Sequence, residues 1–135
     1  MSAKFSEGLV RYLDEEKPYA TVATVLPDGR PHLTVVWVLR DGDDLLISTT
    51  STRQQGRNLL RDPRITVMVN PPATPFLYAE IRGTAEVTED ADHSVLNRVA
   101  RKYTGQDYID FNPDSVNDGP RLVVRVKPEK ITGRL

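Results

Sequence analysis

The chain has 135 residues, of which 39% are hydrophobic and 27% charged, and its formal net charge is −1. This composition is typical of a globular protein with a buried core, and the lack of a basic excess disfavours non-specific nucleic-acid binding. Disulfides, thiolate metal sites and cysteine nucleophiles are excluded because there is no cysteine, and we expect a cytoplasmic protein because no stretch resembles a signal peptide or a membrane span.

The first half of the chain predicts a short helix followed by a three-stranded meander. Residues 4–16 place apolar side chains at helical spacing, and Pro18 ends that helix. The predicted strands, separated by the turn sequences PDGR and RDGDD, are 19–26, 31–39 and 45–50. The apolar face of the second strand, expected to form the interior of a barrel, is Leu33, Val35, Trp37 and Leu39. Its mixed face, expected to look outward, is His32, Thr34, Val36 and Val38.

The second half of the chain predicts two more helices and three more strands. Thr52 is a candidate N-cap for a helix that runs to Arg61, and Gly83 predicts a bend or bulge within a strand. The predicted strands are 65–70, 76–87 and 121–126; the last predicted helix is 90–103, and the polar residues 105–120 are expected to form a loop. Together these elements predict a mainly β fold, a six-stranded antiparallel β-barrel with short helices, formed by one domain that spans residues 1–135.

Hydrolytic and metal chemistry find little support in the sequence. The two histidines, His32 and His93, lie in different predicted elements, and no serine has the surroundings of a nucleophile elbow. No third ligand has the spacing of a zinc site, so we expect no metal site. The acidic run DGDD, residues 41–44, is expected to be a solvated turn rather than a calcium site, and His93 is expected to be solvated near the start of a helix.

Residues 48–59, STTSTRQQGRNL, are the strongest candidate for a binding site. Hydroxyl side chains end a predicted strand there, next to the N-terminus of a predicted helix. Arg53 and Arg57 carry guanidinium groups that match the oxygens of a phosphate, and Gly56 permits close approach of the backbone or a ligand. The sequence therefore favours an anion site, with a solvated loop that caps the helix as the alternative.

The order of these segments resembles the pyridoxamine 5′-phosphate oxidase-like, FMN-binding split barrels. The features that match are the turn PDGRPH, the strand LLIST, the link RNLLRDPR and the strand YAEIRGTAEV. The segments RKYTG (101–105) and RVKPEKITG (125–133) are similar to the actinobacterial branch that uses the deazaflavin coenzyme F-420. The resemblance runs from about Tyr19 to Gly133 and implies a split β-barrel that binds its coenzyme between the subunits of a homodimer.

The resemblance also implies a set of coenzyme-binding residues. The residues along the flavin or deazaflavin ring would be Thr34, Val35, Val36 and Trp37. The residues that reach the ribityl chain and the phosphate would be Ser48, Thr49 and Thr50, and the phosphate partners would be Arg53 and Gln55, with Arg57 as a further cation. The residues that complete the pocket in the homodimer would be Phe76 and Tyr78.

Two departures from the family pattern shape the hypotheses about function. Gln55 stands where relatives usually have Lys, and the chain lacks the C-terminal Trp and Arg residues with which true pyridoxamine phosphate oxidases hold their substrate. The favoured hypothesis is an oxidoreductase that transfers hydride from coenzyme F-420 to a small organic molecule, with no catalytic side chain assigned. The alternatives are an FMN-binding oxidoreductase and a non-catalytic carrier or sensor of flavin or deazaflavin. An oligonucleotide-binding barrel is disfavoured by the charge.

Overall fold

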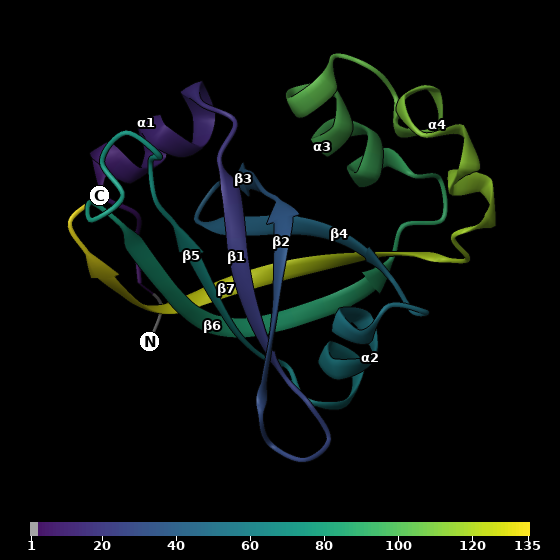
Figure 1. Cartoon of the computed structure of the whole chain (residues 1–135), viewed down its shortest axis with the longest axis horizontal. Helices are drawn as coiled ribbons and strands as arrows, with labels where there is room; N and C mark the ends of the chain where they lie inside the picture. The colour runs from purple at the N-terminus through teal and green to yellow at the C-terminus, as the bar shows by residue number, and fades with distance from the viewer. Residues whose placement is uncertain (1–2) are drawn as a thin grey trace.

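Seven antiparallel strands form the sheet of this protein in a computed structural model that describes residues 3–135 (Figure 1). Their order across the sheet is β2-β1-β5-β6-β7-β4-β3. The strands are β1 (Tyr19–Val25), β2 (Pro31–Trp37), β3 (Leu39–Asp41), β4 (Asp44–Thr50), β5 (Arg64–Val69), β6 (Ala79–Glu89) and β7 (Arg121–Gly133). The helices are α1 (Glu7–Glu15), α2 (Gln54–Arg61), α3 (Ser94–Thr104), α4 (Tyr108–Phe111) and the 3-10 helix η1 (Pro113–Asn117).

The barrel is split between the two edge strands of the sheet, β2 and β3. Within the described residues β2 forms a ladder with β1 alone and β3 with β4 alone, although only Val38 separates β2 from β3 in the sequence. This architecture confirms the predicted mainly β, antiparallel fold class. The strand beyond the predicted six is β3, which continues the meander into residues that we expected in a turn, because a tight hairpin at Gly42 (φ 64°) pairs Asp41 with Asp44.

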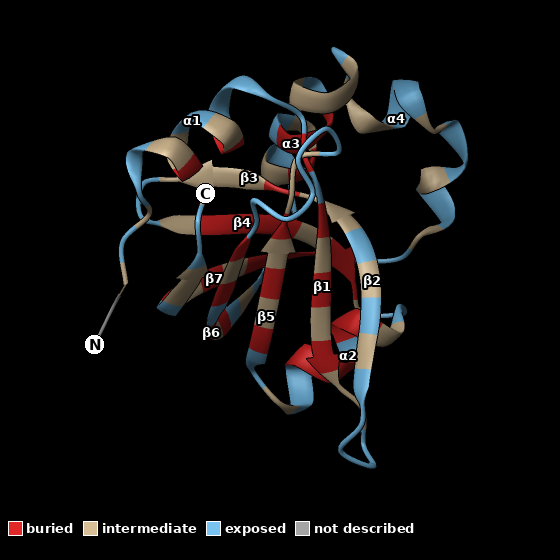
Figure 2. Cartoon of the chain, turned by 60° about the vertical axis from the view of Figure 1, so that its left-hand side comes forward, coloured by how far each residue is buried: buried red, intermediate tan, exposed pale blue. Residues whose placement is uncertain are grey.

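The core joins the inner faces of the strands to the buried side of α1. Leu9 and Leu13 of α1 are fully buried, as their helical spacing predicts. Every second residue of β1 and β5 is buried, which is the period expected of strands with one covered face. Figure 2 shows this buried set running through the central strands, whereas the edge strand β2 carries only exposed and half-buried residues.

Strands β6 and β7 form the longest ladder of the sheet, and it contains the predicted bulge. The register shifts between Arg82 and Gly83, and a Cβ atom at Gly83 would lie 2.2 Å from the carbonyl oxygen of Lys127. Pro128 lies opposite Gly83, at the irregular point where a missing N–H does least harm. Beyond this point β7 continues to Gly133, so the tail that we expected to leave the sheet after residue 126 is part of it.

Four features differ from the sequence-based expectation. Helix α3 begins at Ser94 rather than Asp90, because the Asp90 carboxylate accepts hydrogen bonds from the N–H groups of Val95 (3.3 Å) and Leu96 (2.9 Å) and so caps the helix from outside it. Helix α2 begins at Gln54 with Arg53 as the N-cap residue, so Thr52 is not the N-cap. The segment expected to be a loop contains α4 and η1, and β6 begins at Ala79, three residues later than expected.

The two faces of β2 are the reverse of the prediction. Leu33 and Val35 are 63% and 68% exposed, whereas Val38 is fully buried. The ladder explains the reversal: Thr34 pairs with Val22, which is fully buried, and residues opposite each other in antiparallel strands share a face. Alternation alone gives the two faces of a strand but does not say which one the rest of the chain covers.

Candidate functional site

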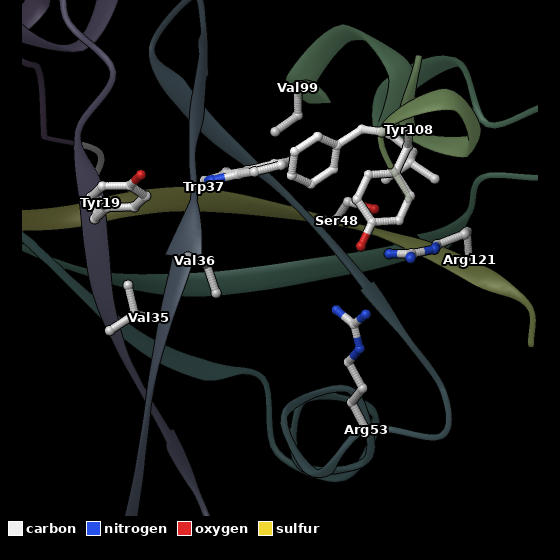
Figure 3. Close-up of a pocket in the computed structure, with 11 residues that line it drawn as sticks. Tyr19, Val35, Val36, Trp37, Ser48, Arg53, Val99, Tyr108 and Arg121 are labelled. Carbon is white, nitrogen blue, oxygen red and sulfur yellow. The ribbon is translucent and has the colours of Figure 1, made fainter. Parts of the chain in front are cut away.

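A cavity of about 300 Å³ opens at the split of the barrel, bounded by β2, β4, α3 and α4. Figure 3 shows its lining residues, with aromatic and aliphatic side chains on one side and two arginines converging from the other. The residues that line it are Tyr19, Val35, Val36, Trp37, Ser48, Arg53, Leu96, Val99, Tyr108, Phe111 and Arg121. A mostly apolar hollow with a few converging polar groups is the usual form of a small-molecule site.

Trp37, at the end of β2, is the centre of the aromatic wall of the cavity. Its ring stacks on that of Tyr103, with centroids 5.1 Å apart and an interplanar angle of 13°, and it meets the rings of Phe111 at 5.5 Å and Tyr108 at 6.2 Å. The Tyr103 hydroxyl accepts a hydrogen bond from the N–H of Val38 at 3.1 Å. This wall is therefore held by stacking and by a bond to the backbone just after β2.

Arg53 and Arg121 supply the positive charge of the cavity. The Arg121 side chain is only 3% exposed, and its guanidinium contacts the Asp118 carboxylate at 2.6 Å and lies 4.8 Å from the centre of the Tyr108 ring. Arg53, at the N-cap of α2, is 47% exposed and lies 3.8 Å from the same carboxylate oxygen of Asp118. Both guanidinium groups point toward the Tyr108 hydroxyl in Figure 3.

The pKa of the Tyr108 hydroxyl is lowered by its polar neighbours, which include these two arginines. Burial of the phenol raises its pKa, but hydrogen bonds with Asn112 and Arg121 outweigh burial and leave the pKa below its ordinary value. The positive charge of Arg121 and a hydrogen bond with Arg53 lower this pKa further. The arrangement therefore suits a ligand that combines an apolar, flat portion with an anionic group.

The hydroxyls at the end of β4 fall into two groups. The Oγ of Ser48 and the Oγ1 of Thr49 are buried and have no hydrogen-bond partner among residues 3–135, and Ser48 lines the cavity. Thr50 is engaged, because its hydroxyl lies 2.9 Å from that of Thr52. A buried hydroxyl without a partner loses free energy on folding unless a ligand or water bonds to it, so Ser48 is a ready donor or acceptor for a molecule in the cavity.

Helix α2 reaches the cavity because Gly56 lets it lie against the end of β4. A Cβ atom at this position would lie 2.0 Å from the carbonyl oxygen of Thr50, which no side chain could tolerate without a shift of the backbone. Gly56 therefore serves the approach of backbone to backbone, one of the two roles expected for it. This contact places Arg53, three residues earlier, at the rim of the cavity.

Gln55 and Arg57, predicted phosphate partners, are both engaged within the protein. The Gln55 side chain is buried and its amide nitrogen donates to the Thr34 hydroxyl at 2.9 Å, which ties α2 to β2. Arg57 donates to the carbonyl oxygen of Thr52 and, at 2.8 Å, to the side-chain oxygen of Gln54. Neither residue lines the cavity, and neither does Thr34.

Phe76 and Tyr78 lie in the segment that precedes β6, away from the cavity lining. Phe76 is 84% exposed and Tyr78 is 40% exposed. Of the twelve residues predicted to bind the coenzyme, the structure brings five together around one cavity: Val35, Val36, Trp37, Ser48 and Arg53. Within a single chain, Phe76 and Tyr78 cannot be added to this group.

Residues of α4 and the start of β7 complete the site, and sequence reasoning did not single them out. Tyr108, Phe111 and Arg121 all line the cavity, and Asp118 contacts both arginines. The sequence did hold one signal, because Arg121 directly precedes the apolar run LVV, where an arginine is uncommon unless it has a buried partner. Because residues 105–120 are mostly polar, we expected a loop there and did not single out Tyr108 and Phe111, which line the cavity.

Metal ligands and membrane spans are absent from the part of the chain that the structure describes. No group of three or more His, Asp or Glu side chains within residues 3–135 is placed to hold a metal ion. His93 is an exposed N-cap residue of α3, as expected, whereas Asp41 and Asp44 of the acidic run bind Arg125 at 2.8 and 3.1 Å rather than being simply solvated. No helix in that range is long and apolar enough to cross a membrane.

Comparison with known proteins places these observations in context. A family model described as pyridoxamine 5′-phosphate oxidase matches residues 7–134. Among solved structures, an F-420 reductase is 27% identical over 90% of this chain and 94% of its own, with a TM-score of 0.77. A conserved hypothetical protein from Mycobacterium tuberculosis is also 27% identical, over 94% of this chain and 82% of its own, with a TM-score of 0.75.

The fold extends to proteins with other ligands. The heme storage protein from Vibrio cholerae has a TM-score of 0.71 over 94% of this chain and 93% of its own, but is only 18% identical, so this likeness is one of fold alone. No curated protein matches the chain.

Proposed function

The chain belongs to the pyridoxamine 5′-phosphate oxidase family, and from this premise we propose that it is an oxidoreductase that binds the deazaflavin coenzyme F-420 at the split of the barrel. The observation that carries the proposal is the cavity, which combines an aromatic wall around Trp37 with the converging guanidinium groups of Arg53 and Arg121. The likeness to an F-420 reductase over 90% of the chain favours a deazaflavin over other ligands of the fold.

The residues of the cavity fit such a coenzyme in three respects. The flat, apolar portion of a deazaflavin matches the wall formed by β2 and the aromatic side chains, which would hold it by stacking and burial. The anionic tail matches Arg53 at the rim, which is partly exposed and has only a long contact to Asp118. The unpartnered Ser48 hydroxyl matches the polar ribityl chain between the two portions.

When bound, coenzyme F-420 supplies hydride-transfer chemistry, so the chain itself needs no nucleophile, metal or cysteine. The role of the chain is to bind and orient the coenzyme. Leu96 and Val99 of α3 keep water from one side of the cavity, and Phe111 of α4 does so from its mouth. The anchoring of Tyr103 to Val38 fixes the Trp37 ring against which a coenzyme ring would lie.

We propose further that the chain works as a homodimer. The outer face of β1 and β2 exposes Tyr19, Leu33 and Val35, and two of these, Tyr19 and Val35, border a groove that reaches residues 70–73 of the loop leading to Phe76. Exposed apolar side chains gathered in this way are typical of an interface, and a two-fold contact would bring the exposed Phe76 of one subunit toward the other.

Spectroscopy of the purified protein tests the proposal. We expect a protein without bound colour that binds added F-420, with a shift in the coenzyme absorbance, and that reoxidises the reduced coenzyme when a suitable acceptor is supplied. A yellow protein with bound FMN that ignores F-420 would favour the second candidate, an FMN-dependent oxidoreductase. Binding of F-420 without turnover of the reduced coenzyme by any acceptor would favour a carrier or sensor.

A further inference from the structure

Asp118, which follows η1 directly, does not line the cavity but contacts both of its arginines, and the proposed function does not explain it. One of its carboxylate oxygens lies 2.6 Å from Arg121 and 3.8 Å from Arg53, so a single acid is shared by the two cations of the site. The segment is also fastened through its backbone, because the Thr52 hydroxyl donates to the carbonyl oxygen of Asp118 at 3.3 Å. The carboxylate is therefore held between the two arginines by contacts on both sides.

The two arginines are not equivalent toward Asp118. Arg121 is almost completely buried, and a buried guanidinium requires a bonded anion, so its charge is balanced by Asp118 at short range. Arg53 is half exposed and its contact with Asp118 is too long for a good hydrogen bond, so its guanidinium can bind a ligand without breaking a close ion pair. Together the three side chains leave one net positive charge at the cavity.

The other charged groups nearby do not change this balance. Arg57 is turned to the backbone of Thr52 and to Gln54 and does not line the cavity. The Asp90 carboxylate accepts hydrogen bonds from the N–H groups in the first turn of α3. Gln55, where a cation stands in relatives, is neutral and donates to Thr34.

We propose that Asp118 is a specificity-determining residue that restricts the anion site to singly charged groups, such as a phosphodiester, over doubly charged phosphomonoesters. The inference deepens the proposed function and rests on it for the identity of the natural ligand. The first negative charge of a ligand phosphate binds Arg53. A second negative charge has no free cation to bind, because the Arg121 guanidinium is already paired with Asp118, and the Asp118 carboxylate repels it. A second charge is therefore desolvated without a partner.

Two small probes that differ by one methyl group test this inference without the coenzyme. Phenyl phosphate is doubly charged at pH 8, well above the second pKa of about 6 for a phosphomonoester, whereas methyl phenyl phosphate is singly charged. Binding of either probe is followed by the fluorescence of Trp37, which is the only tryptophan of the chain and lines the cavity. We expect the wild-type protein to bind the singly charged probe at least as tightly as the doubly charged one.

The variant Asp118→Asn keeps an oxygen acceptor for Arg121 and removes the charge. It should reverse the preference, strengthening phenyl phosphate roughly tenfold relative to methyl phenyl phosphate, the scale of one nearby charge at a partly exposed site. The matched control is Asp114→Asn, which removes the same charge from an exposed position of η1 and should leave the preference unchanged. Arg53→Gln provides a second arm that does not disturb the buried pair, and it should weaken both probes.

Several outcomes would overturn the inference. They are equal shifts for the two probes in Asp118→Asn, the same reversal in Asp114→Asn, and failure of both probes to bind the wild-type protein. A wild-type protein that binds the aryl phosphates with the expected preference but not F-420 would contradict the proposed function and leave the role of Asp118 standing. A protein that binds F-420 while Asp118→Asn changes neither probe would do the opposite.

Discussion

The first half of β7, RLVVRV, and strand β2, PHLTVVW, have similarly apolar sequences but lie in opposite surroundings. β7 is paired on both sides, with β4 and β6, and Val124 and Val126 on it are fully buried. β2 is an edge strand whose Val35 is 68% exposed. The comparison shows that position in the sheet, rather than apolar content, decides whether a strand is covered: β7 forms core, and β2 leaves apolar side chains exposed.

The largest expected effect is a loss of stability, and it separates two single variants that each place an aspartate on one of these strands. Val124→Asp should prevent folding or cost more than about 4 kcal/mol of unfolding free energy, because the carboxylate has no partner in the core. Val35→Asp should leave the fold intact and weaken the proposed homodimer, because the new charge lies on the exposed face. Circular dichroism melts and sedimentation would check both. Equal loss of structure in the two variants would remove the distinction between the strands.

The next effect concerns the packing of α2 against the end of β4. Gly56→Ala should lower the unfolding free energy by roughly 2–4 kcal/mol, because the new methyl group collides with the backbone of Thr50 and pushes the helix away. The matched control is Gly8→Ala in α1, where the nearest atom would be 3.7 Å away, and which should gain about 0.5–1 kcal/mol from better helix propensity. Chemical denaturation measures both; a stable Gly56→Ala variant would mean that α2 does not need this close contact.

At the cavity beside β2, the two predicted phosphate arginines should now differ. Arg53→Ala should weaken F-420 binding by roughly 1.5–3 kcal/mol, the scale of a charge-assisted hydrogen bond, with little change in the melting temperature of the free protein. Arg57→Ala should affect binding much less, because that side chain bonds to its own helix start. Isothermal titration would decide. Equal losses in both variants would mean that the anion reaches beyond the cavity rim.

The smallest effect concerns the contact that fixes the end of β2. Burial is the main cause that raises the pKa of Tyr103 to about 12. Since the folded pKa is above the unfolded value of about 10, the unfolded chain releases this proton first, and the stabilisation is complete below pH 10 and lost between pH 10 and 12. We expect a loss of about 1 kcal/mol, because the ring is partly exposed.

Denaturation at several alkaline pH values, compared with the variant Tyr103→Phe, measures this contribution. The variant should be less stable at neutral pH, because the N–H of Val38 loses its partner, and its stability should depend less on pH above 10. An identical alkaline slope in the two proteins would assign the pH dependence to other groups.

The sequence predicted the features of this protein that depend on residues close together in the chain, and it did not predict those that depend on which strands pair. Hairpin turns and period-2 alternation predicted six of the seven strands and their antiparallel pairing, and a glycine within a strand predicted the bulge at Gly83, because these features depend on local chemistry. The hydroxyls and Arg53 were predicted because they adjoin along the chain. Arg121 and Asp118 were not, because their meeting with Arg53 depends on β7 pairing with β4 more than 60 residues away in sequence. The faces of β2 depended on which neighbour covers them, which no local pattern encodes.

The fluorescence of Trp37 during a titration with coenzyme F-420 tests the central claim most directly. Trp37 is the only tryptophan and stands in the aromatic wall at the split of the barrel, so a coenzyme bound in this cavity lies close to it and should quench its emission. We expect saturable quenching in the wild-type protein, with the midpoint moved to about tenfold or more higher coenzyme concentration in Arg53→Ala. Binding of F-420, measured by calorimetry, that leaves Trp37 emission unchanged would contradict it, because the coenzyme would then lie elsewhere.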